Sequence, residues 1–145
     1  MNIIRATVAD VPDIAPLFDA YRQWYGKTGD LAGASVFLHE RLLNSESVIF
    51  LAFENDQAIG FTQLYPVFSS VSMRREWILN DLFVDASMRN TGAGSALLQT
   101  AKDFVTGQNA KGILLETAPD NAHAQYLYEK MNWEKAENFY YYWTA

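Results

Sequence analysis

Apolar residues return at helical spacing in several stretches of the chain, and runs rich in β-branched and aromatic residues separate these stretches. Between Val11 and Tyr25 the apolar side chains recur every three or four residues, as on one face of an amphipathic helix. The preceding segment Thr7-Val8-Ala9-Asp10 has the form of a capping box in which Asp replaces the usual Glu or Gln. The pattern predicts a short strand over residues 2–6 and a helix after it.

The rest of the chain continues this alternation of helices and strands. Residues 48–53 and 58–65, joined by the polar segment 54–57, predict a β-hairpin whose second strand can continue past Pro66. Further strands are expected at 77–84, at 113–117 and in the terminal aromatic segment 139–143, and further helices are expected to end near Asn44, to run from a glycine-rich loop to about Thr106, and to start at Asn121. This order of elements predicts a mixed α/β fold.

Length and composition indicate one folded domain. The chain has 145 residues, of which 50% are hydrophobic and 14% aromatic, enough for a substantial core in a single domain spanning residues 1–145. It contains no cysteine, which excludes disulfides, thiolate metal sites and a cysteine nucleophile. His39 and His123 lie far apart and lack metal-ligand spacing, so we expect no metal site.

Charge and hydropathy exclude two further kinds of partner. A formal net charge of −6 argues against a nucleic-acid-binding protein, which needs a basic face, and it permits a cationic substrate. The first residues lack the apolar core of a signal peptide, and no apolar run approaches the roughly 20 residues of a membrane span. We therefore expect a cytoplasmic protein that binds neither nucleic acid nor membrane.

The most informative motif is the glycine-rich segment Arg89-Asn90-Thr91-Gly92-Ala93-Gly94 between a predicted strand and a predicted helix. Glycines there let the backbone approach a ligand closely, and the free amides at the positive end of the helix dipole attract an anion, most often phosphate. The spacing fits neither a dinucleotide-binding G-x-G-x-x-G nor a Walker loop. The motif predicts that a phosphorylated ligand binds here.

Two blocks of sequence resemble those of a known family. The pattern R-x-x-G-x-G at residues 89–94 resembles the motif with which the GCN5-related N-acetyltransferases, the GNAT superfamily, hold the pyrophosphate of acetyl-CoA. Residues 121–133 resemble the family's N-x-x-A-x-x-L-Y-E-K-x-G-F segment, with Asn132-Trp133 in place of Gly-Phe. The blocks stand in the expected order, and the resemblance covers essentially the whole chain.

The resemblance implies a GNAT fold, with a central, mixed, twisted sheet of about six to seven strands flanked by about four helices. It implies acetyl-CoA as the donor, direct transfer of its acetyl group to a primary amine, release of CoA, and no metal. The resemblance also implies which residues bind acetyl-CoA. A strand end and Asn121 contact the pantetheine, and the glycine-rich loop holds the pyrophosphate. These residues are Leu82, Phe83, Val84, Arg89, Asn90, Thr91, Gly92, Ala93, Gly94, Ser95 and Asn121.

Acetyl transfer to an amine requires a neutral amine and a proton for the leaving thiolate. Because an alkyl amine is neutral in only about one part in 10³ at pH 7, a base or a desolvating pocket that removes the proton is needed. Asp81, which lies inside an apolar run, is the first candidate for the base, and Glu116 is the second. The alternative for Asp81 is a structural role in which its carboxylate is hydrogen-bonded to loop amides. Tyr128 matches the family tyrosine that protonates the thiolate, and a core position on its helix is the alternative.

The resemblance also implies which residues lie on the acceptor side. In the family the first two helices and their connection wall the acceptor side, which implies Tyr21 and Tyr25, together with Ser69, as acceptor-binding residues. We expect a small acceptor such as a polyamine or an amino-acid-like amine. A protein lysine or N-terminal amine as acceptor, or a catalytically weak CoA-binding module, remains the alternative. The aromatic segment 139–143 suits a half-buried strand or a subunit interface, and an unpaired sheet edge favours a homodimer.

Overall fold

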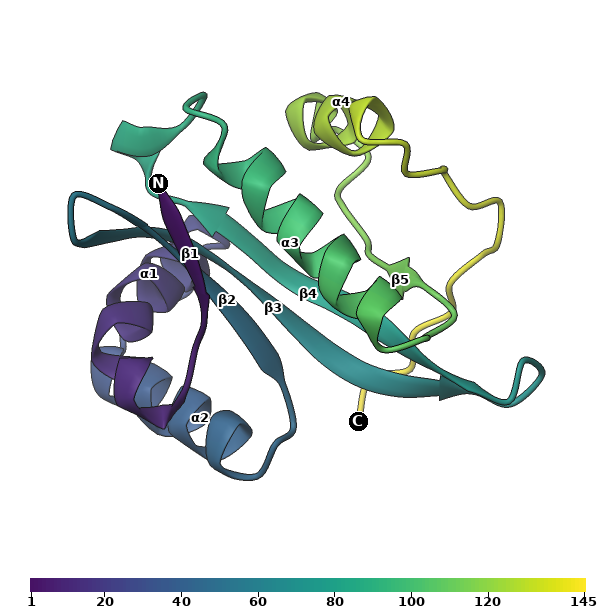
Figure 1. The fold of residues 1–145 in the computed structure, drawn as a ribbon, viewed down its shortest axis with the longest axis horizontal. Coiled ribbons are helices and arrows are strands. Elements are labelled where there is room, and N and C mark those ends of the chain that lie inside the picture. The colour runs from purple at the N-terminus through teal and green to yellow at the C-terminus, as the bar shows by residue number, and fades with distance from the viewer. The chain divides into compact units, whose positions relative to one another are not determined.

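The computed structural model of the chain describes residues 1–145. It divides into two compact units, Met1–Leu115 and Glu116–Ala145, which are described separately (Figure 1). The elements of the first unit are β1 (Asn2–Arg5), the short 3-10 helix η1 (Val8–Asp10), α1 (Val11–Trp24), α2 (Leu31–Leu43), β2 (Val48–Glu54), β3 (Gln57–Ser69), β4 (Arg74–Val84), the 3-10 helix η2 (Ala86–Met88), α3 (Ala93–Gly107) and β5 (Ile113–Leu114). The second unit contains α4 (Ala122–Lys130).

The first unit is a mixed sheet with helices on both faces. Its strand order is β1-β2-β3-β4-β5, with antiparallel pairs throughout except for the parallel pair β4–β5. α1 and α2 pack on one face, where Phe18 meets Phe61, and α3 packs on the other, where Phe104 meets Phe50 and Trp77 (Figure 1). This arrangement confirms the predicted mixed α/β class. No helix is long and apolar enough to cross a membrane.

The predicted capping box before the first helix and the predicted β-hairpin are both present. The Thr7 backbone N–H donates to Asp10 Oδ2 over 2.7 Å in the expected capping box before α1. β3 continues through Pro66 to Ser69, as predicted. Proline is tolerated there because the pairing of β3 with β2 begins only at Leu64, so the missing N–H of Pro66 leaves no β2 ladder bond unmade.

Two predictions about strands are wrong. The sheet has five strands rather than six to seven, because residues 131–145 form no strand and the aromatic segment 139–143 lies exposed. Aromatic residues favour a strand only where a neighbouring strand supplies hydrogen bonds and packing. β5 is also shorter than the predicted 113–117, because it pairs with β4 only at Trp77 and Ile78.

A β-bulge in β4 sets which residues face α1. Gln63 pairs with Asp81, but the next residue of β3, Leu64, pairs with Leu79, so Asn80 is the extra residue. An extra residue exchanges the two faces of the strand beyond it. Trp77, before the bulge, therefore packs on α3, whereas Phe83, after it, packs on Tyr21 of α1. The bulge thus turns Asp81 and Phe83 to the same face as α1.

Candidate active site

Asp81 is a buried carboxylate held by amide donors. It is only 4% exposed, although Asp is rarely buried without a partner. Gln63 Nε2 donates to Oδ2 over 2.8 Å, and Asn80 Nδ2 donates to Oδ1 over 3.0 Å. Burial raises the pKa of the Asp81 carboxyl above its ordinary value, and the hydrogen bonds from Gln63, Asn80 and Tyr21 offset part of that rise. The raised pKa makes Asp81 a stronger base than an exposed aspartate.

Tyr21, expected on the acceptor side, lies beside Asp81. Its ring meets Phe61 and Phe83 edge-on, with centroids 6.0 Å away in both cases, and its hydroxyl lies 3.5 Å from the backbone oxygen of Asn80. Burial, and then the negative charge of Asp81, raise the pKa of the Tyr21 phenol far above its ordinary value. Tyr21 is therefore a neutral hydroxyl at physiological pH.

Two polar residues of β3, Gln63 and Tyr65, also lie near Asp81, and the sequence analysis did not predict them as site residues. Gln63 is fully buried, and burial together with the charge of Asp81 raises the pKa of Tyr65 to about 12. Gln63 carried a usable signal, because strand alternation from Ile59 through Phe61 places it on the apolar face of β3. A polar side chain on such a face needs a partner, and Asp81 is that partner.

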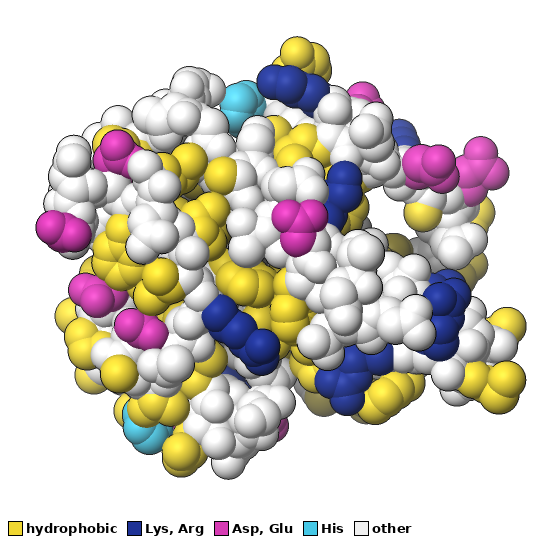
Figure 2. Space-filling model, viewed as in Figure 1, with side chains coloured by type: hydrophobic (Ala, Val, Ile, Leu, Met, Phe, Trp, Pro, Cys, Tyr) yellow, Lys and Arg dark blue, Asp and Glu magenta, His cyan; other side chains and the backbone are white.

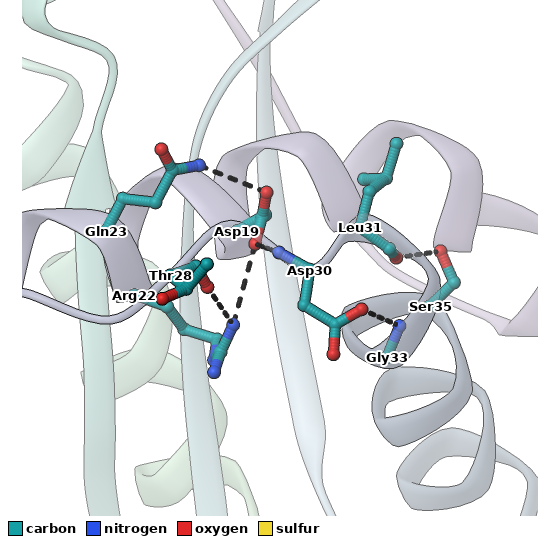
Figure 3. A network of polar contacts seen from close by, with 8 residues as sticks. All are labelled: Asp19, Arg22, Gln23, Thr28, Asp30, Leu31, Gly33 and Ser35. Carbon is teal, nitrogen blue, oxygen red and sulfur yellow. Dashed lines mark hydrogen bonds and ion pairs between the residues drawn. The ribbon is translucent and has the colours of Figure 1, made fainter.

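Asp19 on α1 anchors the connection between α1 and α2 (Figure 3). Asp19 Oδ1 accepts a hydrogen bond from the Asp30 backbone N–H over 2.8 Å, and Oδ2 accepts one from Gln23 Nε2 over 3.1 Å. Arg22 Nη1 lies 3.6 Å from Asp19 Oδ1. These contacts hold residues 26–30, the segment expected on the acceptor side, against the end of α1.

The end of α1 exposes aromatic side chains. Trp24 and Tyr25 are 59% and 61% exposed, and the Tyr25 ring meets Tyr21 edge-on at a centroid distance of 5.0 Å. Figure 2 shows hydrophobic side chains at the surface over α1 and α2, with acidic side chains among them. Ser69 is not part of this region. It ends β3 six residues from Gln63, roughly 20 Å along the strand, and its Oγ accepts from the Ser72 N–H.

The glycine-rich loop leads into α3 with its amides uncapped. Gly92 is the N-cap residue, with a left-handed φ of 92°, and no side chain caps the first turn. A Cβ built on Gly92 meets no atom within 4 Å, so the space in front of the turn is open. Asn90 also has a positive φ, of 64°. An uncapped helix N-terminus that faces open space fits a phosphate group, as the motif predicts.

The strand end before this loop has one unpaired edge. β3 pairs with β4 through Val84, whereas β5 pairs with β4 only at Trp77 and Ile78. No strand of the first unit therefore pairs with the outer edge of β4 at Leu82, Phe83 and Val84, where pantetheine is expected to bind. Arg89 Nε donates to the Val84 backbone oxygen over 3.2 Å, which ties its guanidinium to this strand end.

The second unit carries the remaining predicted residues. Asn121 is the N-cap of α4, as expected, and its Oδ1 accepts from the Ala124 N–H over 3.2 Å. Tyr128 lies on α4, half-buried, with its ring centroid 6.0 Å from that of Trp133. Glu116 is exposed and lies two residues beyond the end of β5, not within the strand as predicted. No group of three or more His, Cys, Asp or Glu side chains is arranged to hold a metal ion.

Comparison with known proteins relates the chain to one family. The model of the acetyltransferase (GNAT) family matches residues 14–133. The chain is 51% identical over 142 residues to the uncharacterized N-acetyltransferase YhfO of Bacillus subtilis (strain 168), covering 98% of this chain and 95% of that protein. It is 37% identical over 119 residues to a probable acetyltransferase of Haemophilus influenzae, covering 81% and 82%. The crystal structure of a probable acetyltransferase matches with a TM-score of 0.94 at 38% identity, covering 100% of this chain and 97% of that one.

Proposed function

Because this chain belongs to the acetyltransferase (GNAT) family and is an acyltransferase, we propose that it transfers the acetyl group of acetyl-CoA directly to the primary amine of a small molecule. The observation that carries this proposal is the buried Asp81 carboxylate, which lies beside Tyr21 on the strand that leads to the open glycine loop. Strand β4 and the loop after it therefore combine a base for an ammonium group with a binding site for a phosphorylated donor.

The donor would be held by backbone groups. The uncapped amides from Gly92 to Ser95 would bind its pyrophosphate, and the unpaired edge of β4 at residues 82–84 would pair with its pantetheine. Arg89 and Asn90, with Thr91, complete the loop, and Asn121 would contact the pantetheine. When bound, acetyl-CoA supplies an activated acetyl thioester. The match of the family model to residues 14–133 supports the proposal that both units act as one domain.

Two side chains would move protons. Asp81 would take the proton of the acceptor ammonium, a task for which its raised pKa suits it. Tyr128 would donate its hydroxyl proton to the leaving thiolate, which has a basicity comparable to that of a phenol. Glu116 is the second candidate for the base, and its exposed position beyond β5 favours Asp81 over it.

The acceptor side favours a small cationic amine. Tyr21 lies beside the Asp81 carboxylate and the Tyr25 ring contacts that of Tyr21, and a cationic amine is attracted both by a carboxylate and by aromatic rings. A protein lysine or N-terminal amine is the second candidate, because exposed aromatic side chains such as Trp24 also suit a peptide surface. A CoA-binding module with weak activity is the third.

We also propose that the protein is a cytoplasmic homodimer. The exposed aromatic segment 139–143 supports the homodimer, because aromatic residues are enriched at interfaces. Light scattering at high micromolar concentration is expected to give the mass of two chains. The mass of one chain would contradict it.

The direct test is release of free thiol from acetyl-CoA across a panel of polyamines, amino acids, other small amines and lysine-containing peptides. We expect release with at least one small primary amine and little with the peptides. Release with the peptides alone would assign a protein acceptor, and no release above the amine-free control would indicate a binding module.

A further inference from the structure

Asn80 is the exposed residue of the polar cluster around Asp81. It is the extra residue of the β-bulge, so it has no partner on β3, and it is exposed although Leu79 and Asp81 on either side of it are buried. The Tyr21 hydroxyl donates to the Asn80 backbone oxygen over 3.5 Å, which places Asn80 beside α1. The bulge therefore brings one solvent-accessible amide to the buried carboxylate.

The contact with Asp81 fixes which way the Asn80 amide points. Asn80 Nδ2 donates to Asp81 Oδ1 over 3.0 Å. An ionised carboxylate only accepts hydrogen bonds, so the NH₂ group of Asn80 must face it, and Asn80 Oδ1 must face away from it. Asn80 Oδ1 itself has no hydrogen-bond partner within the chain. It is therefore an acceptor that a ligand can reach from solvent.

Asp81 and its two amide partners have more acceptors than donors. Gln63 Nε2 also donates to the carboxylate, and Gln63 Oε1 is enclosed with no hydrogen-bond partner. None of the ion pairs within the chain involves Asp81, although a carboxylate is rarely buried without a partner of opposite charge. A primary ammonium group carries a positive charge and only N–H donors, which are the two properties that this cluster lacks.

We propose that Asn80 is an acceptor-binding residue whose Oδ1 accepts a hydrogen bond from the ammonium group of the substrate. The inference rests on the proposed acetyl transfer and adds to it a residue that recognises the acceptor. Of the two amides, only Asn80 makes this contact from solvent, because Gln63 is fully buried. One N–H of the ammonium bonds Asn80 Oδ1, while another N–H bond breaks, its proton goes to the Asp81 carboxylate, and its electron pair stays on the nitrogen. The neutral amine is then held in place by Asn80.

The first measurement is thiol release with the best amine of the panel at pH 8, with the amine and acetyl-CoA varied separately. Asn80→Ala is expected to raise the KM for the amine by about tenfold or more, as for a lost hydrogen bond to a charged group, and to leave the KM for acetyl-CoA unchanged. Asn80 does not have a left-handed φ, so Ala replaces it without backbone strain. Asn2→Ala, at an exposed Asn on β1, should leave both KM values unchanged.

Gln63→Met is the matched control for the hydrogen bond that Asn80 gives to Asp81. Both amides donate to this carboxylate, but only Asn80 offers an oxygen to the substrate. Gln63→Met should therefore lower kcat and leave the KM for the amine close to that of the wild type. An equal rise of that KM in Asn80→Ala and Gln63→Met, or no rise in Asn80→Ala, would overturn the contact.

The second measurement is calorimetric titration of the amines of the panel into the protein saturated with CoA, which follows binding without turnover. Asn80→Ala should lose about tenfold in affinity for the amine, with its affinity for CoA unchanged. Equal amine affinity in wild type and Asn80→Ala would overturn the contact alone. A wild-type protein that binds an amine but releases no thiol with it would overturn the proposed function, whereas the loss of amine affinity in Asn80→Ala would still support the contact.

Discussion

Gln63 and Asp81 stand directly opposite each other on β3 and β4, and the Gln63 amide donates to the Asp81 carboxylate over 2.8 Å in the buried face of the sheet. The bulge at Asn80 turns Asp81 toward the face that Gln63 shares with α1, and Tyr21 of α1 lies beside the carboxylate. A buried charge is tolerated only with such partners. The free-energy cost of burying Asp81 is therefore reduced by amide donors from Gln63 on the neighbouring strand β3 and from Asn80 on β4 itself.

Replacing Gln63 tests this pair through stability. Because the pKa of Asp81 is raised above 3.8 in the folded protein, its contribution to stability falls as the pH rises from 3.8 through the folded pKa. Gln63→Met removes a donor and raises that pKa further. The variant is expected to lose about 1–3 kcal/mol in the free energy of unfolding at neutral pH and less in mild acid.

Urea unfolding between pH 5 and pH 8 measures this loss. The matched control is Thr62→Val on the same strand, because Thr62 Oγ1 donates to the uncharged backbone oxygen of Asp81 over 2.9 Å. Its loss should not change with pH. A Gln63→Met variant with a pH-independent loss would show that Gln63 does not interact with the carboxylate.

The glycine loop is tested by the affinity for CoA. Gly92→Val places a branched side chain in front of the uncapped turn of α3, at a left-handed φ that such residues rarely adopt. Calorimetry is expected to show a loss of affinity of at least about tenfold, or 1.4 kcal/mol. Gly107→Val, at the other end of the same helix and also with open space at Cβ, should bind CoA like the wild type. Equal affinity in a folded Gly92→Val protein would refute the phosphate site.

The role of Tyr128 is separable from its packing. Tyr128→Phe keeps the ring beside Trp133 and removes only the hydroxyl proton. If that proton goes to the leaving thiolate, turnover should fall by roughly 10²-fold with CoA affinity nearly unchanged. Tyr126→Phe on the same helix, with an exposed ring, is the control and should keep full turnover. Full turnover in Tyr128→Phe would leave that side chain with a packing role.

The sequence predicted those parts of the fold that depend on residues close together along the chain. The capping box at Thr7, the β2–β3 hairpin and the start of α4 at Asn121 are encoded locally, and the family resemblance was confirmed by the comparisons. The role of Gln63 depends on a register between distant strands, and the bulge at Asn80 has no local signature. The terminal strand was predicted wrongly because aromatic composition cannot specify a pairing partner.

The most direct test of the account is the pH profile of kcat/KM for Asp81→Asn with the best small amine, beside wild type and the exposed control Asp103→Asn on α3. If Asp81 accepts the acceptor's proton, the variant loses about 10²-fold at pH 7 and progressively less toward pH 10, because the amine there no longer needs a base. Asp103→Asn should follow the wild type at every pH. A loss in Asp81→Asn that is the same from pH 6 to pH 10 would contradict the account and leave Asp81 a structural residue.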